Sequence, residues 1–140
     1  MRIKKIDHIA INTLDIDGSI KFYTKYLGLR RLETVDMKDF ELTYIEVPGG
    51  GSIELFDYGG RNPRVDRKDE DTGLRHLAFE VEGINEWERK LREMGVTVTL
   101  PLTELPELNA RVVLFLDPNG VTIEFSEKMR GTSSGLGYTV

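Results

Sequence analysis

One short signature occurs twice in the chain, and this repeat restricts the possible folds more than any other feature. The two copies end at Glu54 and Glu124, and both read P-x-G-x-x-I-E. The chain has two histidines, His8 and His76, which precede these glutamates by 46 and 48 residues. Because a generic fold does not require the same polar residues twice at matched spacing, the repeat predicts two related structural modules.

Each module is predicted to have the order strand, helix, strand, strand, strand. Apolar residues recur at helical spacing after each histidine, and the expected helices end at Gly28 and Gly95. Asp15 or Asp17 is expected to cap the first helix, and Asn85, with Glu88 three residues later, the second. The predicted strands are 6–12, 29–35, 42–47 and 52–58 in the first module and 74–81, 96–100, 111–116 and 121–126 in the second. Three aromatic residues on the helices are expected to pack against the sheet: Tyr23, Tyr26 and Trp87.

Two imidazoles and two carboxylates have the composition of a divalent-metal site. Each glutamate lies between apolar residues of a strand, so it should face away from the side on which those neighbours pack against a helix. A single histidine or glutamate is more often an ordinary polar residue of a sheet than a ligand. Their duplication favours His8, Glu54, His76 and Glu124 as ligands of one Ni, Co, Zn, Mn or Fe ion with positions left open for substrate.

These features together predict one domain of the α+β class. A chain of 140 residues is long enough for a single domain with its own core. We expect tandem βαβββ modules that form a curved mixed sheet surrounding a metal site. The expected boundaries are 1–58 for the first module, 59–73 for a linker loop, 74–127 for the second module and 128–140 for a mobile tail.

Composition excludes several other functions. The chain has no cysteine, which rules out disulfides and thiolate ligands. A formal charge of −5 argues against nucleic acid as a partner. No apolar segment approaches the length of a membrane span or signal peptide, so we expect a cytoplasmic protein that does not bind membranes. Four basic residues of the loop could bind an anionic substrate, but the acidic residues between them favour a solvated loop: Arg61, Arg64, Arg67 and Lys68.

Nearly the whole chain, from His8 to about Glu127, resembles the vicinal oxygen chelate superfamily of glyoxalases, bleomycin resistance proteins and dioxygenases. Three stretches carry the resemblance: HIAINTLDIDGSIKFYTKYLGL, GLRHLAFEVEGINEWERKLREMGV and FLDPNGVTIEF. The pattern of two histidines and two glutamates is similar to the glyoxalase I branch. The resemblance implies tandem βαβββ modules and the four ligands named above. It also implies a homodimer, because small bacterial members build each site where modules meet, commonly across two subunits.

The same resemblance implies a metal-dependent lyase or isomerase, similar to lactoylglutathione lyase, a carbon–sulfur lyase. Such an enzyme moves a proton next to a carbonyl through a metal-chelated enediolate, and a hemithioacetal is a candidate substrate. By matching position, Glu124 is the expected general base and Glu54 returns the proton on the opposite face. Whether the site forms within one chain or across a dimer stays open.

The chain departs from the glutathione-using members at two positions near the site. Asn12 stands where those members often have arginine, and Tyr58 stands where they often have asparagine. The segment LTELPELNAR, expected to be a loop before the strand at 111–116, supplies glutamates and no lysine. These departures count against glutathione and leave another thiol adduct, or a hydroxy- or ketoacid, as the small-molecule substrate.

Three other functions fit the same superfamily. An extradiol-type dioxygenase uses two histidines and one carboxylate, so Glu54 would occupy a position that catechol and dioxygen need. An acyl-CoA epimerase usually has glutamine at the place of Glu54. A non-catalytic small-molecule binding protein of this fold would not need four ligands.

Overall fold

The computed structural model describes residues 1–129. The predicted tail 128–140 lies outside the described residues except for Met129 and Lys128, which ends the last strand. The chain divides into two compact units, Met1–Asp66 and Arg67–Val140, and this division falls within the segment predicted as a linker. Each unit has the order strand, helix, three strands, so the predicted α+β class and repeated βαβββ order are confirmed. The limits of the modules as domains stay a prediction. Within residues 1–129, no helix has the length and apolar character needed to cross a bilayer.

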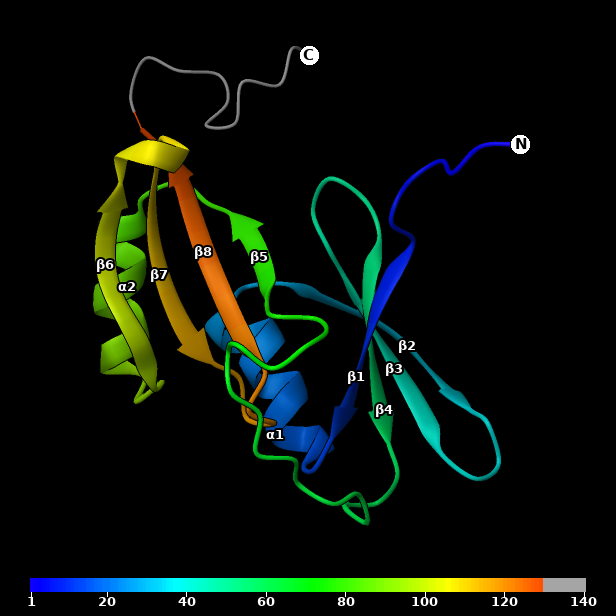
Figure 1. Ribbon diagram of the computed structural model, residues 1–140. Coiled ribbons are helices and arrows are strands. Elements are labelled where there is room, and N and C mark those ends of the chain that lie inside the picture. The colour runs from blue at the N-terminus through cyan, green and yellow to red at the C-terminus, as the bar shows by residue number, and fades with distance from the viewer. Residues whose placement is uncertain (130–140) are drawn as a thin grey trace. The chain divides into compact units, whose positions relative to one another are not determined.

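The elements of each unit follow one another as Figure 1 shows. The first unit contains β1 (His8–Thr13), α1 (Ile16–Lys21), η1 (Phe22–Tyr26), β2 (Arg30–Asp36), β3 (Glu41–Glu46) and β4 (Ser52–Asp57). The second unit contains β5 (Leu77–Glu80), α2 (Ile84–Glu93), β6 (Val98–Leu105), η2 (Pro106–Leu108), β7 (Ala110–Leu116) and β8 (Thr122–Lys128).

Each unit forms its own four-stranded mixed sheet. The strand orders are β1-β4-β3-β2 and β5-β8-β7-β6. In both sheets the first strand pairs in parallel with the last, and the remaining pairs are antiparallel. The parallel pair therefore brings the start of each unit beside its end, although more than forty residues separate them in sequence.

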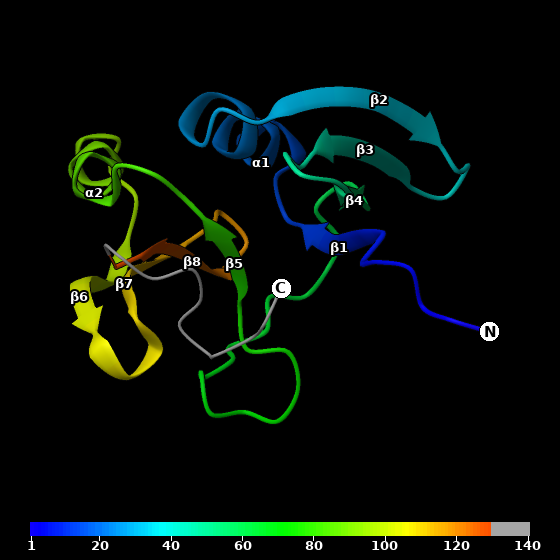
Figure 2. The ribbon, with the colours of Figure 1, turned by 90° about the horizontal axis from the view of Figure 1, so that it is seen from above.

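One helix packs on one face of each sheet, as the views in Figures 1 and 2 agree. The apolar neighbours of the repeated glutamates lie on this helix-covered face, where they are almost fully buried: Ile53, Leu55, Ile123 and Phe125. The ring of Trp87 on α2 lies 4.9 Å from the ring of Phe125. Most of the hydrophobic core of each unit thus lies between helix and sheet, and the alternation of a strand turns the glutamates to the opposite face.

The first helix starts as the sequence predicts and then widens. Asp15 is its N-cap, and the Asp15 carboxylate accepts a hydrogen bond of 3.1 Å from the backbone N–H of Gly18. After Lys21 the chain continues as the π-helical segment η1, in which the Leu27 N–H donates to the Phe22 carbonyl. This wider turn places the adjacent residues Phe22 and Tyr23 both in the core, which a regular 3, 4 spacing does not predict.

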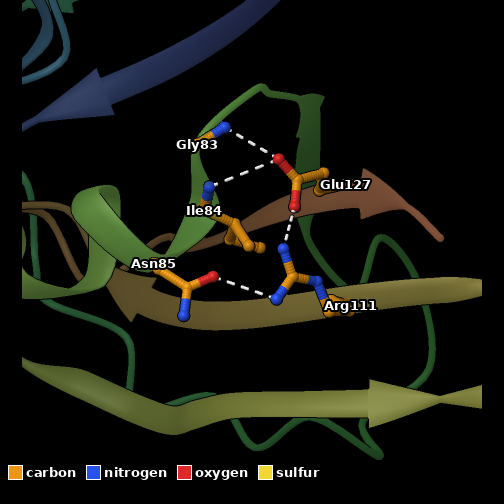
Figure 3. A network of polar contacts seen from close by, with 5 residues as sticks. All are labelled: Gly83, Ile84, Asn85, Arg111 and Glu127. Atoms are coloured by element: carbon orange, nitrogen blue, oxygen red, sulfur yellow. Dashed lines mark hydrogen bonds and ion pairs between the residues drawn. The ribbon is translucent and has the colours of Figure 1, made fainter. Parts of the chain in front are cut away.

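The second helix is capped by a distant residue, and the prediction of an Asn85 cap was wrong. Its N-cap is Gly83 at φ 70°, a left-handed conformation that glycine adopts without strain. Glu127 on β8 accepts hydrogen bonds from the backbone N–H groups of Gly83 and Ile84 and from the Arg111 guanidinium (Figure 3). Asn85 accepts a hydrogen bond from Arg111 at 2.9 Å. The cap was missed because it depends on a contact 44 residues away.

The segment expected to be a loop before β7 is largely a strand, so that prediction was also wrong. β6 extends to Leu105 and is followed by the short helix η2. β6 lies at the edge of its sheet, where Pro101 is tolerated, and its pairing with β7 shifts register twice between Val98 and Thr103. The strand predicted at 96–100 therefore continues to Leu105, and the proline and the charged residues hid this irregular extension.

Candidate metal centre

The structure brings the first predicted pair of ligands together on the open face of the first sheet. His8 begins β1 and Glu54 lies in the middle of the adjacent strand β4. His8 Nε2 lies 3.3 Å from the Oε2 atom of Glu54. Ala10, the residue directly opposite Glu54 on β1, is exposed and has a short side chain.

Two neighbouring side chains contact this first pair, one on the histidine and one on the glutamate. The Asp7 carboxylate lies 2.9 Å from His8 Nδ1, and the Tyr44 hydroxyl donates a hydrogen bond to Glu54. The hydrogen bond to Asp7, followed by the charge of Glu54, raises the pKa of His8. The hydrogen bond to the Glu54 carboxylate likewise raises the pKa of Tyr44. Because Asp7 contacts Nδ1 of His8, Nε2 is the ring nitrogen that faces the Glu54 carboxylate.

The second predicted pair forms in the same way in the second unit. His76 directly precedes β5, Glu124 lies on β8, and His76 Nε2 is 3.1 Å from the Oε2 atom of Glu124. Ala78 stands opposite Glu124, as Ala10 stands opposite Glu54. The repeated register therefore places a histidine and a glutamate side by side in each unit.

The surroundings of the second pair differ from those of the first. Leu114 lies opposite Glu124 at the place that Tyr44 has opposite Glu54, and a leucine side chain offers no hydrogen bond. His76 Nδ1 is buried and has no hydrogen-bond partner among residues 1–129. Burying an unpaired polar atom costs about 1–3 kcal/mol, and this cost is the same with or without a metal ion, because Nε2 is the nitrogen that faces Glu124.

Both pairs fit a divalent metal ion by their chemistry and spacing. Two ligand atoms about 2.1 Å from an ion lie about 3.0 Å apart at a right angle and about 3.4 Å apart in a tetrahedron. The nitrogen–oxygen separations of 3.3 and 3.1 Å fall in this range. The side chains of Glu54 and Glu124 are 11% and 19% exposed, and those of His8 and His76 are 42% and 25% exposed, so each pair is reachable at the surface of its own unit.

No group of three or more candidate ligands occurs among residues 1–129. Each unit supplies one histidine and one glutamate, and the assignment of the four as ligands of one ion stays a prediction. Sequence reasoning missed Asp7 and Tyr44 as the neighbours that orient the first pair. Asp7 could have been found from its place next to His8, whereas Tyr44 needs the register between β3 and β4.

The comparison with known families agrees with this fold. Residues 5–125 match the family model of the Glyoxalase/Bleomycin resistance protein/Dioxygenase superfamily. The chain belongs to this superfamily, which confirms the resemblance found in the sequence. Members of the superfamily commonly bind a divalent metal ion.

Known relatives carry more than one activity. Lactoylglutathione lyase of Haemophilus influenzae is 31% identical over 139 residues, which covers 95% of this chain and 98% of that protein. Mitochondrial methylmalonyl-CoA epimerase of Dictyostelium discoideum is 28% identical over 133 residues, which covers 90% of this chain and 80% of that protein. The crystal structure of a glyoxalase family protein from Enterococcus faecalis superposes with a TM-score of 0.76 at 31% identity and covers 91% of this chain and 100% of that chain. These similarities support the superfamily rather than one reaction.

Proposed function

We propose that the chain is a metal-dependent lyase or isomerase of the glyoxalase I type, which transfers a proton between two neighbouring carbons of an oxygen-rich substrate. The observation that carries the proposal is the repeated pair, a histidine Nε2 within 3.3 Å of a glutamate oxygen in each unit. His8, Glu54, His76 and Glu124 would hold one divalent ion. When bound, that ion would stabilise negative charge on two neighbouring substrate oxygens.

The different surroundings of the two carboxylates support different roles for them. Tyr44 donates a hydrogen bond to Glu54, whereas Glu124 faces Leu114. A carboxylate with fewer hydrogen bonds is easier to move toward a substrate. Glu124 would therefore take the proton from the carbon that carries the hydroxyl, and Glu54 would return a proton to the neighbouring carbonyl carbon. On a hemithioacetal this transfer yields a hydroxyacyl thioester, with no gain or loss of electrons.

A screen of hemithioacetals tests this proposal. Metal-reconstituted protein is incubated with hemithioacetals formed from several thiols, and thioester formation is followed by absorbance. Turnover with any of the thiols supports the glyoxalase type. No turnover with all of them, together with racemisation of an acyl-CoA, would assign the chain to the epimerases instead. That second candidate is favoured by the similarity to the Dictyostelium epimerase.

The remaining two alternatives have their own tests. An extradiol dioxygenase would consume oxygen when the Fe(II)-loaded protein meets a catechol. A non-catalytic binding protein would bind small molecules without taking up metal. The presence of a carboxylate in both units argues against each of them, because the first uses one carboxylate and the second needs none.

A further inference from the structure

An aromatic cluster lies on the same face of the first sheet as Glu54. We define it as Phe40, Phe56 and Tyr58. Phe56 follows Glu54 by two residues on β4, so both side chains point to the face opposite the helix, about 7 Å apart along the strand. The ring of Phe40 stacks on that of Phe56 at 5.3 Å, with an angle of 15° between them. Tyr58 completes the cluster at 5.0 Å from Phe40.

Turns at both ends fix the rings in place. Phe40 ends the turn between β2 and β3, in which the Met37 N–H donates to the Phe40 carbonyl at 2.9 Å. Tyr58 follows the end of β4, where the Asp57 carboxylate accepts a hydrogen bond of 2.8 Å from the Gly59 N–H. The three rings are half-buried, so each keeps part of its surface exposed. A rigid and partly exposed group of rings is suited to contact another flat apolar group.

The second unit has polar residues at the corresponding positions. Ser126 follows Glu124 by two residues, as Phe56 follows Glu54, and Lys128 lies two residues further. Lys128 Nζ is 3.6 Å from a carboxylate oxygen of Glu80. The repeated fold therefore does not need aromatic side chains at these positions. Most core residues lie on the other face of each sheet, although Leu42, the cross-strand neighbour of Phe56, is also buried.

We propose that the aromatic cluster binds an aromatic ring of the substrate. This ring would lie next to the two substrate oxygens that the bound metal ion would stabilise. This inference rests on the proposed function and names the class of its substrate. Three rings and one hydroxyl favour a flat apolar group, and Tyr58 stands where the glutathione-using pattern often has asparagine.

The test compares two oxygen chelators that differ in their substituent. Benzohydroxamate and acetohydroxamate carry the same chelating group, with a phenyl ring in the first and a methyl group in the second. Their affinities for the metal-loaded protein are measured by calorimetry in the unmodified chain and in variants Phe56→Ser and Tyr58→Asn. Serine is the residue that the second unit has at the corresponding position, and Tyr58 lies beyond the strand, where substitution disturbs the sheet least.

We expect the unmodified chain to prefer benzohydroxamate, and each variant to reduce that preference about tenfold, a change of about 1.4 kcal/mol. Met37→Ser, which removes an exposed apolar side chain from the same turn, should leave the preference unchanged. If both chelators bind but the preference is equal in the unmodified chain and both variants, the aromatic site is refuted and the proposed function stands. If neither chelator binds the metal-loaded protein, the proposed function fails as well.

Discussion

The two units of the chain share strand order, register and one His–Glu pair each, yet they support these pairs differently. In the first unit Asp7 holds the outer nitrogen of His8, and Tyr44 holds Glu54. In the second unit His76 Nδ1 has no partner within residues 1–129, and Leu114 stands opposite Glu124. The difference extends along the strands, where an aromatic cluster in the first unit corresponds to serine and lysine in the second.

The contrast shows that the sheet determines the position of the His–Glu pair but not the residues around it. The parallel pairing of the first and last strands sets the histidine beside the glutamate in both units. The side chains around that pair are free to diverge, because they affect the mobility and basicity of the ligands rather than the fold. Two carboxylates of the same type thereby acquire the means to act differently.

Replacing Glu54 or Glu124 by glutamine, one at a time, should give the largest difference between the two units. With metal at saturation, Glu124→Gln should lower kcat about 10³-fold, because an amide cannot accept the substrate proton. Glu54→Gln should lower it only about tenfold, because water can return the proton that Glu54 would supply. Steady-state kinetics measure both effects, and thermal unfolding checks that the variants fold. Equal losses, or unchanged turnover in Glu124→Gln, would show that the base is misassigned.

The neighbour of the first histidine should matter more than the neighbour of the second. Asp7→Asn is expected to weaken metal binding about ten- to a hundredfold, because the carboxylate on Nδ1 fixes the orientation and tautomer of His8. Arg75→Gln changes the residue that precedes His76 and is the matched control. Calorimetric titration with zinc measures both, and a similar loss in the two variants would contradict the asymmetry.

A tyrosine placed opposite Glu124, as Tyr44 is placed opposite Glu54, should make the surroundings of the two glutamates more alike. Leu114→Tyr places a hydroxyl opposite Glu124, as Tyr44 lies opposite Glu54, and should lower kcat about tenfold by restraining the base. Leu114→Phe has nearly the same size without the hydroxyl and should slow turnover much less. If the phenylalanine variant is slowed as much, steric bulk rather than hydrogen bonding is responsible.

The two helices provide a smaller contrast, since one is capped locally and the other from β8. Burial alone would raise the pKa of Glu127, but hydrogen bonds from Arg111 and from the Gly83 and Ile84 N–H groups outweigh it and hold the pKa below its usual 4.5. The charge therefore stabilises the folded chain above pH 4.5, and this contribution is lost as the pH falls through the lower folded pKa.

Glu127→Gln should accordingly reduce the free energy of unfolding at neutral pH by about 1 kcal/mol, and by less in acid. Asp15→Asn in the first unit should change it little, because asparagine is also a good N-cap. Urea unfolding at both pH values measures these effects. A loss in Glu127→Gln that does not diminish in acid would rule out the charge as its source.

The repeated elements could be predicted from the sequence because their signals are local. Short sequence patterns predict the two glutamates, their apolar neighbours and the Asp15 cap, and each of these features lies within a few residues of its pattern. The pairing of His8 with Glu54 followed from the duplication rather than from any local preference. A repeat supplies long-range information that a single module does not contain.

The features that could not be predicted depend on contacts between distant strands. Glu127 caps α2 from another strand, and Tyr44 reaches Glu54 through the register of β3 and β4. The π-helical turn at Phe22 results from packing, which favours burying two adjacent aromatic rings over regular helical spacing. The extension of edge strand β6 beyond the predicted residues 96–100 was hidden by Pro101, which is compatible with a strand only where one side is unpaired.

Metal stoichiometry tests the central claim most directly, namely that the two pairs together bind one divalent ion. Protein purified without chelator, and then titrated with nickel, cobalt, zinc or manganese, is analysed for bound metal beside the variants His8→Ala and His76→Ala. We predict one ion per chain for the unmodified protein and a large loss of affinity in both variants, because each unit contributes half of the ligands. Less than about 0.1 ion per chain without uptake on titration, or binding unchanged in both variants, would contradict it.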